Sequence, residues 1–210
     1  MSMSRRGSRA SVFCGRRVDL LAVAALGCVV LAGCGSAERT GAPQVPAGAP
    51  SDWLDRTYTV TCDGIVPDGF SADVVDGGAR VAADGSHPPY FEHYDVKVTA
   101  TVSGDVDGDA APDAVVLLQC SPQPSNYFVQ EVQVFSSTGG SLGSLPSPRT
   151  LQGDAPLPPV YDPDGLSVQH GEIISAMTAY GPDDSHASGP SVPLTVRWRF
   201  DGQGFARVLS

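Results

Sequence analysis

The 210-residue sequence has few basic residues, and this scarcity limits what the protein can bind. It carries 13 lysines and arginines against 23 aspartates and glutamates, for a formal net charge of −10. Lys97 is its only lysine. Because nucleic-acid binding uses lysine and arginine to neutralise phosphates, this balance argues against a nucleic-acid partner. It also argues against a polybasic patch that binds anionic membranes.

Residue patterns that would indicate catalysis are scarce as well. The histidines lack the spacing of a zinc site, and we expect them on the surface: His87, His93, His170 and His186. No serine stands three residues before Lys97, which excludes a serine–lysine mechanism of the Ser-x-x-Lys type. The sequence therefore favours a non-enzymatic protein over an enzyme.

The sequence also lacks an apolar run long enough to span a membrane. The apolar run near the N-terminus, Leu20–Ala32, has 13 residues without a charge, whereas a spanning helix needs about 20. It follows five arginines and ends at Leu31-Ala32-Gly33-Cys34, which resembles the lipobox of bacterial lipoprotein signal peptides. The resemblance implies cleavage before Cys34 and acylation of that cysteine. The alternative is an ordinary secretory signal in which Cys34 is incidental.

These features divide the chain into three parts. Residues 1–33 are the expected signal peptide, residues 34–50 the lipidated cysteine with a flexible Ala/Gly/Pro-rich tether, and residues 51–210 a single folded domain. The expected location is the extracytoplasmic face of the bacterial cell membrane, with the lipid on Cys34 as the membrane contact. Residues 16–21 also resemble a twin-arginine signal, but Asp19 departs from that pattern, so the export route stays open.

The composition favours strands over helices, because 18 prolines and 24 glycines interrupt the chain. Apolar and polar residues alternate with period two over 57–62, 94–102 and 192–200. Residues 114–118 are continuously apolar, as expected for a central strand covered on both faces. Further strands are expected over 127–135, 173–180 and 205–209.

Turns and one helix complete the expected structure. His170-Gly171 and Asp201-Gly202 are typical of hairpin turns, and Asp162-Pro163-Asp164-Gly165 of a plain turn. The only helix expected is a short turn over residues 52–56, capped by Ser51. We predict a mainly β fold, an antiparallel sheet or β-sandwich-like single domain with minimal helix.

Two cysteines remain for a disulfide once the signal peptide and the lipid anchor are accounted for. Cys62 and Cys120 both lie on the inward phase of expected strands, and an oxidising compartment favours a bond between them. This disulfide would close a loop of 58 residues and stabilise the domain by about 4 kcal/mol. The alternative is two buried free thiols.

The chain expected after cleavage is strongly acidic. Five of the 13 basic residues but only one of the 23 acidic residues precede Cys34, which leaves 8 basic and 22 acidic residues. Eighteen of these 22 are aspartates, which favour turns and oxygen-ligand sites over helices. Most of them are explained by solubility alone.

One segment concentrates these aspartates between two expected strands. It runs from Asp105 to Asp113 and has carboxylates at its first, third, fifth and ninth positions, with the carbonyl of Ala111 available at the seventh. Calcium binds six to eight oxygens at about 2.3–2.6 Å, and alternating aspartates in a tight loop can supply several of them. The candidate calcium ligands are Asp105, Asp107, Asp109, Ala111 and Asp113.

This segment resembles the β-hairpin calcium loops of FG-GAP repeats in integrin α-subunits and related bacterial proteins. Val116 stands where an EF-hand needs a bidentate acid, and the flanks are strands rather than helices. Ala110 occupies a position where the FG-GAP loops usually have glycine, and a positive φ there would cost about 1 kcal/mol. The alternative interpretation is an acidic turn without an ion.

The expected C-terminal strands add a second resemblance. With the lipobox, the segments 104–109 and 198–205 resemble parts of small lipoproteins of actinobacterial cell envelopes. We therefore expect a lipid-anchored domain that binds an envelope protein or glycan and holds a structural calcium ion. The alternative is a metal-dependent envelope hydrolase with a cleft beside Asp107.

Overall fold

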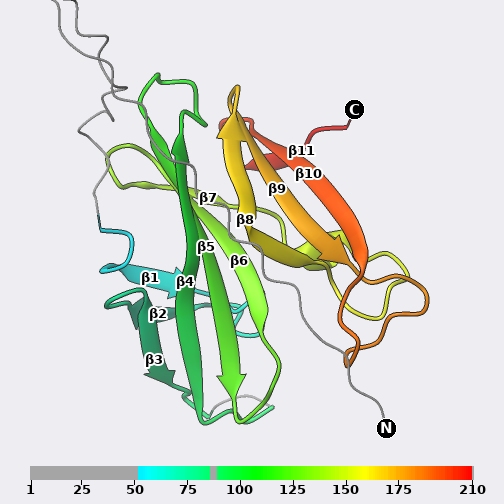
Figure 1. The fold of residues 1–210 in the computed structure, drawn as a ribbon. Coiled ribbons are helices and arrows are strands. Elements are labelled where there is room, and N and C mark those ends of the chain that lie inside the picture. The colour runs from blue at the N-terminus through cyan, green and yellow to red at the C-terminus, as the bar shows by residue number, and fades with distance from the viewer. Residues whose placement is uncertain (1–51, 86–88, 210) are drawn as a thin grey trace, which may run out of the picture. The chain divides into compact units, whose positions relative to one another are not determined.

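The computed structural model describes residues 52–85 and 89–209, which belong to one compact unit, Gln44–Ser210. Cys34, the signal peptide and the tether lie outside the described residues. Strands are the main regular secondary structure of the described chain (Figure 1). They are β1 (Thr57–Val60), β2 (Phe70–Asp73), β3 (Gly78–Ala82), β4 (His93–Gly104), β5 (Asp113–Gln123), β6 (Val129–Phe135), β7 (Ser141–Ser144), β8 (Val160–Gln169), β9 (Glu172–Ala179), β10 (Val192–Phe200) and β11 (Phe205–Arg207).

The strands form three antiparallel sheets. β1 pairs with β2, a five-stranded sheet has the order β3-β4-β5-β6-β7, and a four-stranded sheet has the order β11-β10-β9-β8. The predicted mainly β, antiparallel fold is confirmed. Over the described ranges, no helix is long and apolar enough to cross a membrane.

The five-stranded sheet is the middle layer, because its central strand is buried on both faces. Val116 and Leu118 of β5 belong to one hydrophobic cluster, whereas their neighbours Val115 and Leu117 belong to another. The first cluster is completed by β1, β2 and Trp53, and the second by residues of β8–β11. The continuous apolar run in the sequence is thus explained, since each face of β5 needs apolar side chains.

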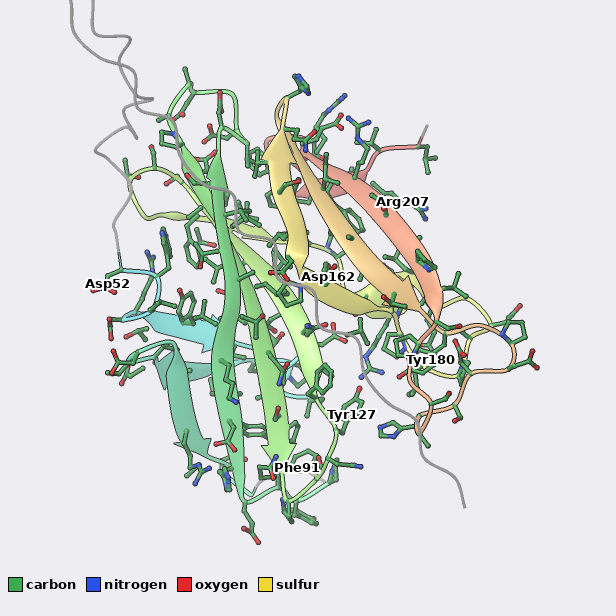
Figure 2. The ribbon with its side chains drawn as sticks, in the orientation of Figure 1. Asp52, Phe91, Tyr127, Asp162, Tyr180 and Arg207 are labelled. Atoms are coloured by element: carbon green, nitrogen blue, oxygen red, sulfur yellow. A yellow bond between two sulfur atoms is a disulfide. The ribbon has the colours of Figure 1, made fainter. Side chains whose placement is uncertain are left out.

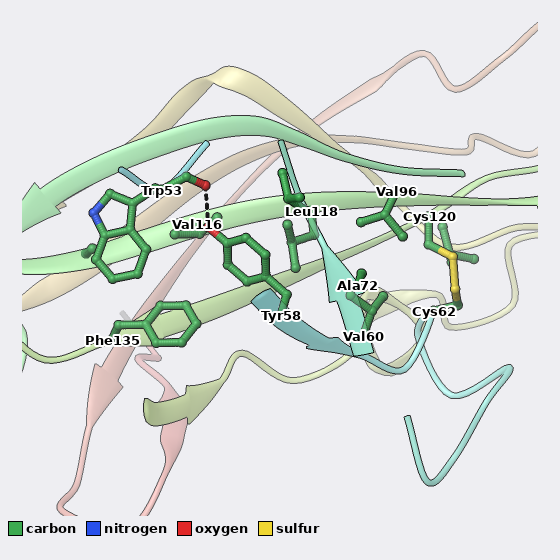
Figure 3. Close-up of a cluster of buried hydrophobic side chains, with 13 residues drawn as sticks. Trp53, Tyr58, Val60, Cys62, Ala72, Val96, Val116, Leu118, Cys120 and Phe135 are labelled. Atoms are coloured by element: carbon green, nitrogen blue, oxygen red, sulfur yellow. Dashed lines mark hydrogen bonds between the residues drawn. A yellow bond between two sulfur atoms is a disulfide. The ribbon is translucent and has the colours of Figure 1, made fainter. Parts of the chain in front are cut away.

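Aromatic packing and a disulfide attach β1 to the middle sheet (Figure 3). The Phe135 ring lies 4.9 Å from that of Trp53 and 5.9 Å from that of Tyr58, measured between centroids. The Tyr58 hydroxyl donates a hydrogen bond of 2.5 Å to the Trp53 carbonyl. The predicted bond between Cys62 and Cys120 is present, with 5.3 Å between their Cα atoms.

Buried polar side chains of β6 also bind the backbone beside β1. The Glu131 carboxylate accepts from the Thr61 amide at 3.2 Å and from the Thr61 hydroxyl at 2.7 Å. The Gln133 amide donates to the Thr59 carbonyl at 2.7 Å and to Glu131 at 2.8 Å. These bonds replace a strand-to-strand ladder and satisfy polar groups that would otherwise be buried without partners.

Two predictions of local structure were wrong. Residues 52–56 form a single turn, with the Asp55 amide bonded to the Asp52 carbonyl, because Trp53 packs into the core before a helix can continue. Asp162-Pro163-Asp164-Gly165 is a bulge within β8, not the plain turn that we predicted. Its four residues lie between the pairs Tyr161–Met177 and Leu166–Ser175, so the pairing with β9 resumes after them.

The described chain has one short helix, which the sequence did not indicate. It is a 3-10 turn, η1 (Pro148–Leu151), whose start is capped by the Ser147 side chain accepting from the Arg149 amide. Ser147 precedes a proline at the first helical position, which is a favourable start for a helical turn. This turn places Arg149 beside a pocket described below.

Candidate functional site

The acidic loop joins β4 to β5, between Gly104 and Asp113, as the sequence predicts. It brings together three of the proposed ligands, because carboxylate oxygens of Asp105, Asp107 and Asp109 all lie within 4.8 Å of one another. Two oxygens on opposite sides of one calcium ion are at most about 5.2 Å apart. The separations within the triad are therefore compatible with one shared cation.

Hydrogen bonds to backbone amides hold this triad in place. Asp105 accepts from the amides of Gly108 at 2.7 Å and Ala110 at 3.2 Å. Asp107 accepts from the Asp109 amide at 3.0 Å, and Asp109 accepts from the amide of Ala111 at 2.7 Å. Each carboxylate thus fixes the chain a few residues ahead of it, which is typical of aspartates in tight turns.

Asp113 is not part of the triad. Its buried carboxylate accepts from the amides of Val106 at 2.8 Å, Asp107 at 3.2 Å and Ser137 at 3.1 Å. Burial raises the pKa of Asp113, the negative charge of Asp107 raises it further, and the amide hydrogen bonds oppose both effects. Asp113 therefore ties the acidic loop to the segment after β6, and its role as an ion ligand stays a prediction.

Ala110 has the backbone conformation that the loop resemblance implies. Its φ is +67°, in the left-handed region that favours glycine, and Gly108 has a φ of +85°. Ala111 donates its amide to Asp109, while coordination by its carbonyl stays a prediction. The loop thus keeps its tight path despite the alanine.

Among the described residues, one further sequence pattern could suggest a serine nucleophile, but its structure differs from that of such a site. Gly139–Gly143 matches the Gly-x-Ser-x-Gly pattern of serine hydrolases. It forms a turn and the start of β7, whereas the nucleophile elbow of those enzymes joins a strand to a helix. Ser141 accepts from the Gly143 amide. Within residues 52–85 and 89–209, no hydrogen bond joins a histidine to a serine or cysteine.

A second group of polar side chains surrounds a hollow of about 220 Å³, which we call the polar pocket. Its walls come from Thr61, 63–64, 131–132, 144–148 and Tyr161. Asp63 follows Cys62 in a turn where both residues have positive φ, 49° for Cys62 and 52° for Asp63. The disulfide holds Cys62, and the Glu131 carboxylate accepts from the Asp63 amide at 3.3 Å.

Two side chains that line the polar pocket have unused hydrogen-bonding capacity at atoms open to the hollow, since no buried side-chain nitrogen or oxygen of the described residues lacks a partner. The Asp63 side chain is 4% exposed, and only its Oδ2 atom has a partner among the described residues, Arg149 Nε at 3.0 Å. Tyr161 is 3% exposed, and none of the described residues bonds its hydroxyl. Burial and then the charge of Asp63 raise the pKa of Tyr161, so the hydroxyl keeps its proton at neutral pH.

An adjoining hollow of about 260 Å³, the aromatic pocket, shares Asp63 and Pro148 with the polar pocket. Its aromatic walls include Tyr127, which precedes β6, and Tyr180, which follows β9 (Figure 2). Arg149 connects the two pockets, because its Nη2 atom donates to the Tyr127 hydroxyl at 3.0 Å while its Nε atom binds Asp63.

A third hollow, of about 450 Å³, has a different character. Its aromatic residues already pack on each other, with 4.8 Å between the ring centroids of Phe70 and Tyr94 and 5.9 Å between those of Phe91 and Tyr94. None of these three hollows includes a residue of the acidic loop in its wall. The loop and the pockets are therefore separate features of the surface.

No protein-family model matches this chain, and neither a curated protein nor a solved structure shows significant similarity to it.

Proposed function

We propose that this chain is a lipid-anchored protein of the extracytoplasmic face of a bacterial membrane, and that its β domain is a non-enzymatic binding module. The anchor is the lipid on Cys34, which follows an arginine-rich start and an uncharged run. The disulfide between Cys62 and Cys120 supports this location, because such bonds persist in oxidising compartments.

A structural calcium ion in the acidic loop is the second part of the proposal. The observation that carries it is the convergence of Asp105, Asp107 and Asp109 within 4.8 Å. Three carboxylates this close repel one another, and a divalent cation would remove that repulsion. The ion would stabilise the connection between β4 and β5, which lies in the middle layer of the fold.

Thermal unfolding in excess calcium and in excess chelator tests the ion. Calcium at about 100 times its dissociation constant would add about 2.7 kcal/mol, or about 5–11 °C in Tm for a domain of this size. Asp107→Ala should abolish the shift. Asp164→Ala, which removes an exposed aspartate of the β8 bulge, should preserve it and serves as the matched control. Equal midpoints in calcium and chelator would identify the loop as an acidic turn.

Acylation is tested separately from the ion. The full chain, expressed in a bacterium fed with radiolabelled palmitate, should carry the label and sediment with membranes. Cys34→Ala should lose both properties. Label that persists in the variant, or a wild-type chain that stays unlabelled, would refute the anchor.

A further inference from the structure

We propose that the polar pocket and the aromatic pocket together form a binding groove for a neutral carbohydrate chain. This proposal rests on the proposed function, since it names the class of ligand that the binding module takes. One sugar unit would place its hydroxyls against Asp63 and Tyr161 in the polar pocket. The next unit would lay its ring against the aromatic side chains of the neighbouring pocket.

The polar pocket is built to receive a ligand with hydroxyl groups. The Oδ1 atom of Asp63 needs a donor, and the hydroxyl of Tyr161 can both donate and accept. Both side chains are more than nine-tenths buried and line the same hollow. No buried side-chain nitrogen or oxygen of the described residues lacks a partner, so the unpaired Oδ1 atom of Asp63 and the hydroxyl of Tyr161 must be open to the hollow, where a ligand or water can bond them.

The charges of the groove exclude an anionic ligand and disfavour a cationic one. Asp63 and Glu131 bring two carboxylates to the polar pocket, and Arg149 supplies one guanidinium group. An anion would therefore meet a net negative site. An ammonium group could donate to Asp63, but it has no acceptor for the proton of Tyr161, whereas a sugar hydroxyl satisfies both.

The aromatic pocket supplies the apolar surface that a sugar ring needs. Phe128 is 39% exposed, and Tyr127 and Tyr180 are partly exposed at the same hollow. The axial C–H groups of a sugar ring present an apolar face, while its hydroxyls remain at the rim. An aromatic ring with a polar edge, such as tyrosine, suits such an amphipathic ligand.

Isothermal titration calorimetry on the full chain in mild detergent tests the groove. The probes are maltotetraose, cellotetraose, mannotetraose and tetra-N-acetylchitotetraose, all of them neutral, each titrated up to millimolar concentration. At least one should bind with a stoichiometry of one. Tyr161→Phe should weaken that binding about three- to tenfold, because it removes one hydrogen bond to the sugar. Its Tm should match the wild type, since the lost hydroxyl has no partner among the described residues.

Tyr58→Phe is the matched control, because it removes another buried tyrosine hydroxyl, one that bonds the Trp53 carbonyl. It should lower Tm and leave sugar affinity unchanged. The proposal is overturned if none of the four probes binds, if Tyr161→Phe binds as well as the wild type, or if putrescine binds in place of the sugars.

The result of the sugar titrations is independent of the results of the calcium and acylation tests. Sugar binding without a calcium shift would refute the ion and keep the groove. A calcium shift and acylation without sugar binding would refute the groove and keep the proposed location and ion.

Discussion

The β8 bulge packs so closely against β9 that a single methyl group should disrupt it. A Cβ atom at Gly165 would lie 2.3 Å from the Cβ atom of Ala176 and 3.4 Å from its Cα atom. Neither atom can rotate away, because both are fixed to the backbone. We expect Gly165→Ala to force the bulge away from β9 at a cost of about 1–3 kcal/mol, as for other overpacked sites.

The facing methyl group offers a direct rescue. Ala176→Gly removes the atom that the new Cβ would meet, and by itself should cost about 0.5–1 kcal/mol as a glycine within a strand. The double variant Gly165→Ala/Ala176→Gly should therefore be more stable than Gly165→Ala alone. Urea unfolding of the four proteins gives the coupling energy, which we expect to exceed about 1 kcal/mol.

Two results would refute this reasoning. If Gly165→Ala is as stable as the wild type, the bulge has room that the distances exclude. If the effects of the two substitutions simply add, the loss in Gly165→Ala comes from another contact. Because Tyr161 directly precedes the bulge, Gly165→Ala should also weaken binding in the polar pocket, and the double variant should restore it.

Two further predictions concern covalent and ionic links between strands. Replacing Cys62 and Cys120 by serine should lower the free energy of unfolding by about 4 kcal/mol, because the bond closes a loop of 58 residues, and urea unfolding measures the change. Hydrogen bonding to Arg199, followed by that to Arg197, lowers the pKa of Glu172 below its usual 4.5. Its ionised form therefore stabilises the fold above that pH, and this contribution is lost as the pH falls through the lowered pKa. Between about pH 5 and pH 3, Tm should fall less steeply in Glu172→Gln than in the wild type; equal slopes would contradict the assignment.

The strands were predictable where one face of a sheet is buried and the segment is long. The alternation of 94–102 and 192–200 corresponds to β4 and β10, and the apolar run at 114–118 lies within β5. β2, β3 and β7, of four or five residues each, were missed, whereas the equally short β1 was recognised because its alternation continues through Cys62. β8 was missed for a different reason, since turn-forming residues occupy its bulge.

The two candidate sites differ in how far apart their residues lie in the sequence, and this decided which site could be predicted. The acidic loop is contiguous in sequence, so the spacing of Asp105, Asp107 and Asp109 was enough to propose that they converge. The groove is assembled from segments far apart in the chain, such as Asp63, Glu131 and Tyr161. No local pattern connects these residues; they meet because the segment after β1, strand β6 and strand β8 line the same hollow.

The position of β5 between two layers determines how its amides should exchange with solvent. The backbone of β5 pairs with β4 and β6, and its side chains are covered on both faces. Its amides should exchange in deuterated water only through global unfolding. By contrast, β1 is bound to β6 through the side chains of Glu131 and Gln133 and to β5 through one disulfide. We therefore expect the amides of β1 and β2 to exchange before those of β5, through a local opening that would remove one wall of the polar pocket.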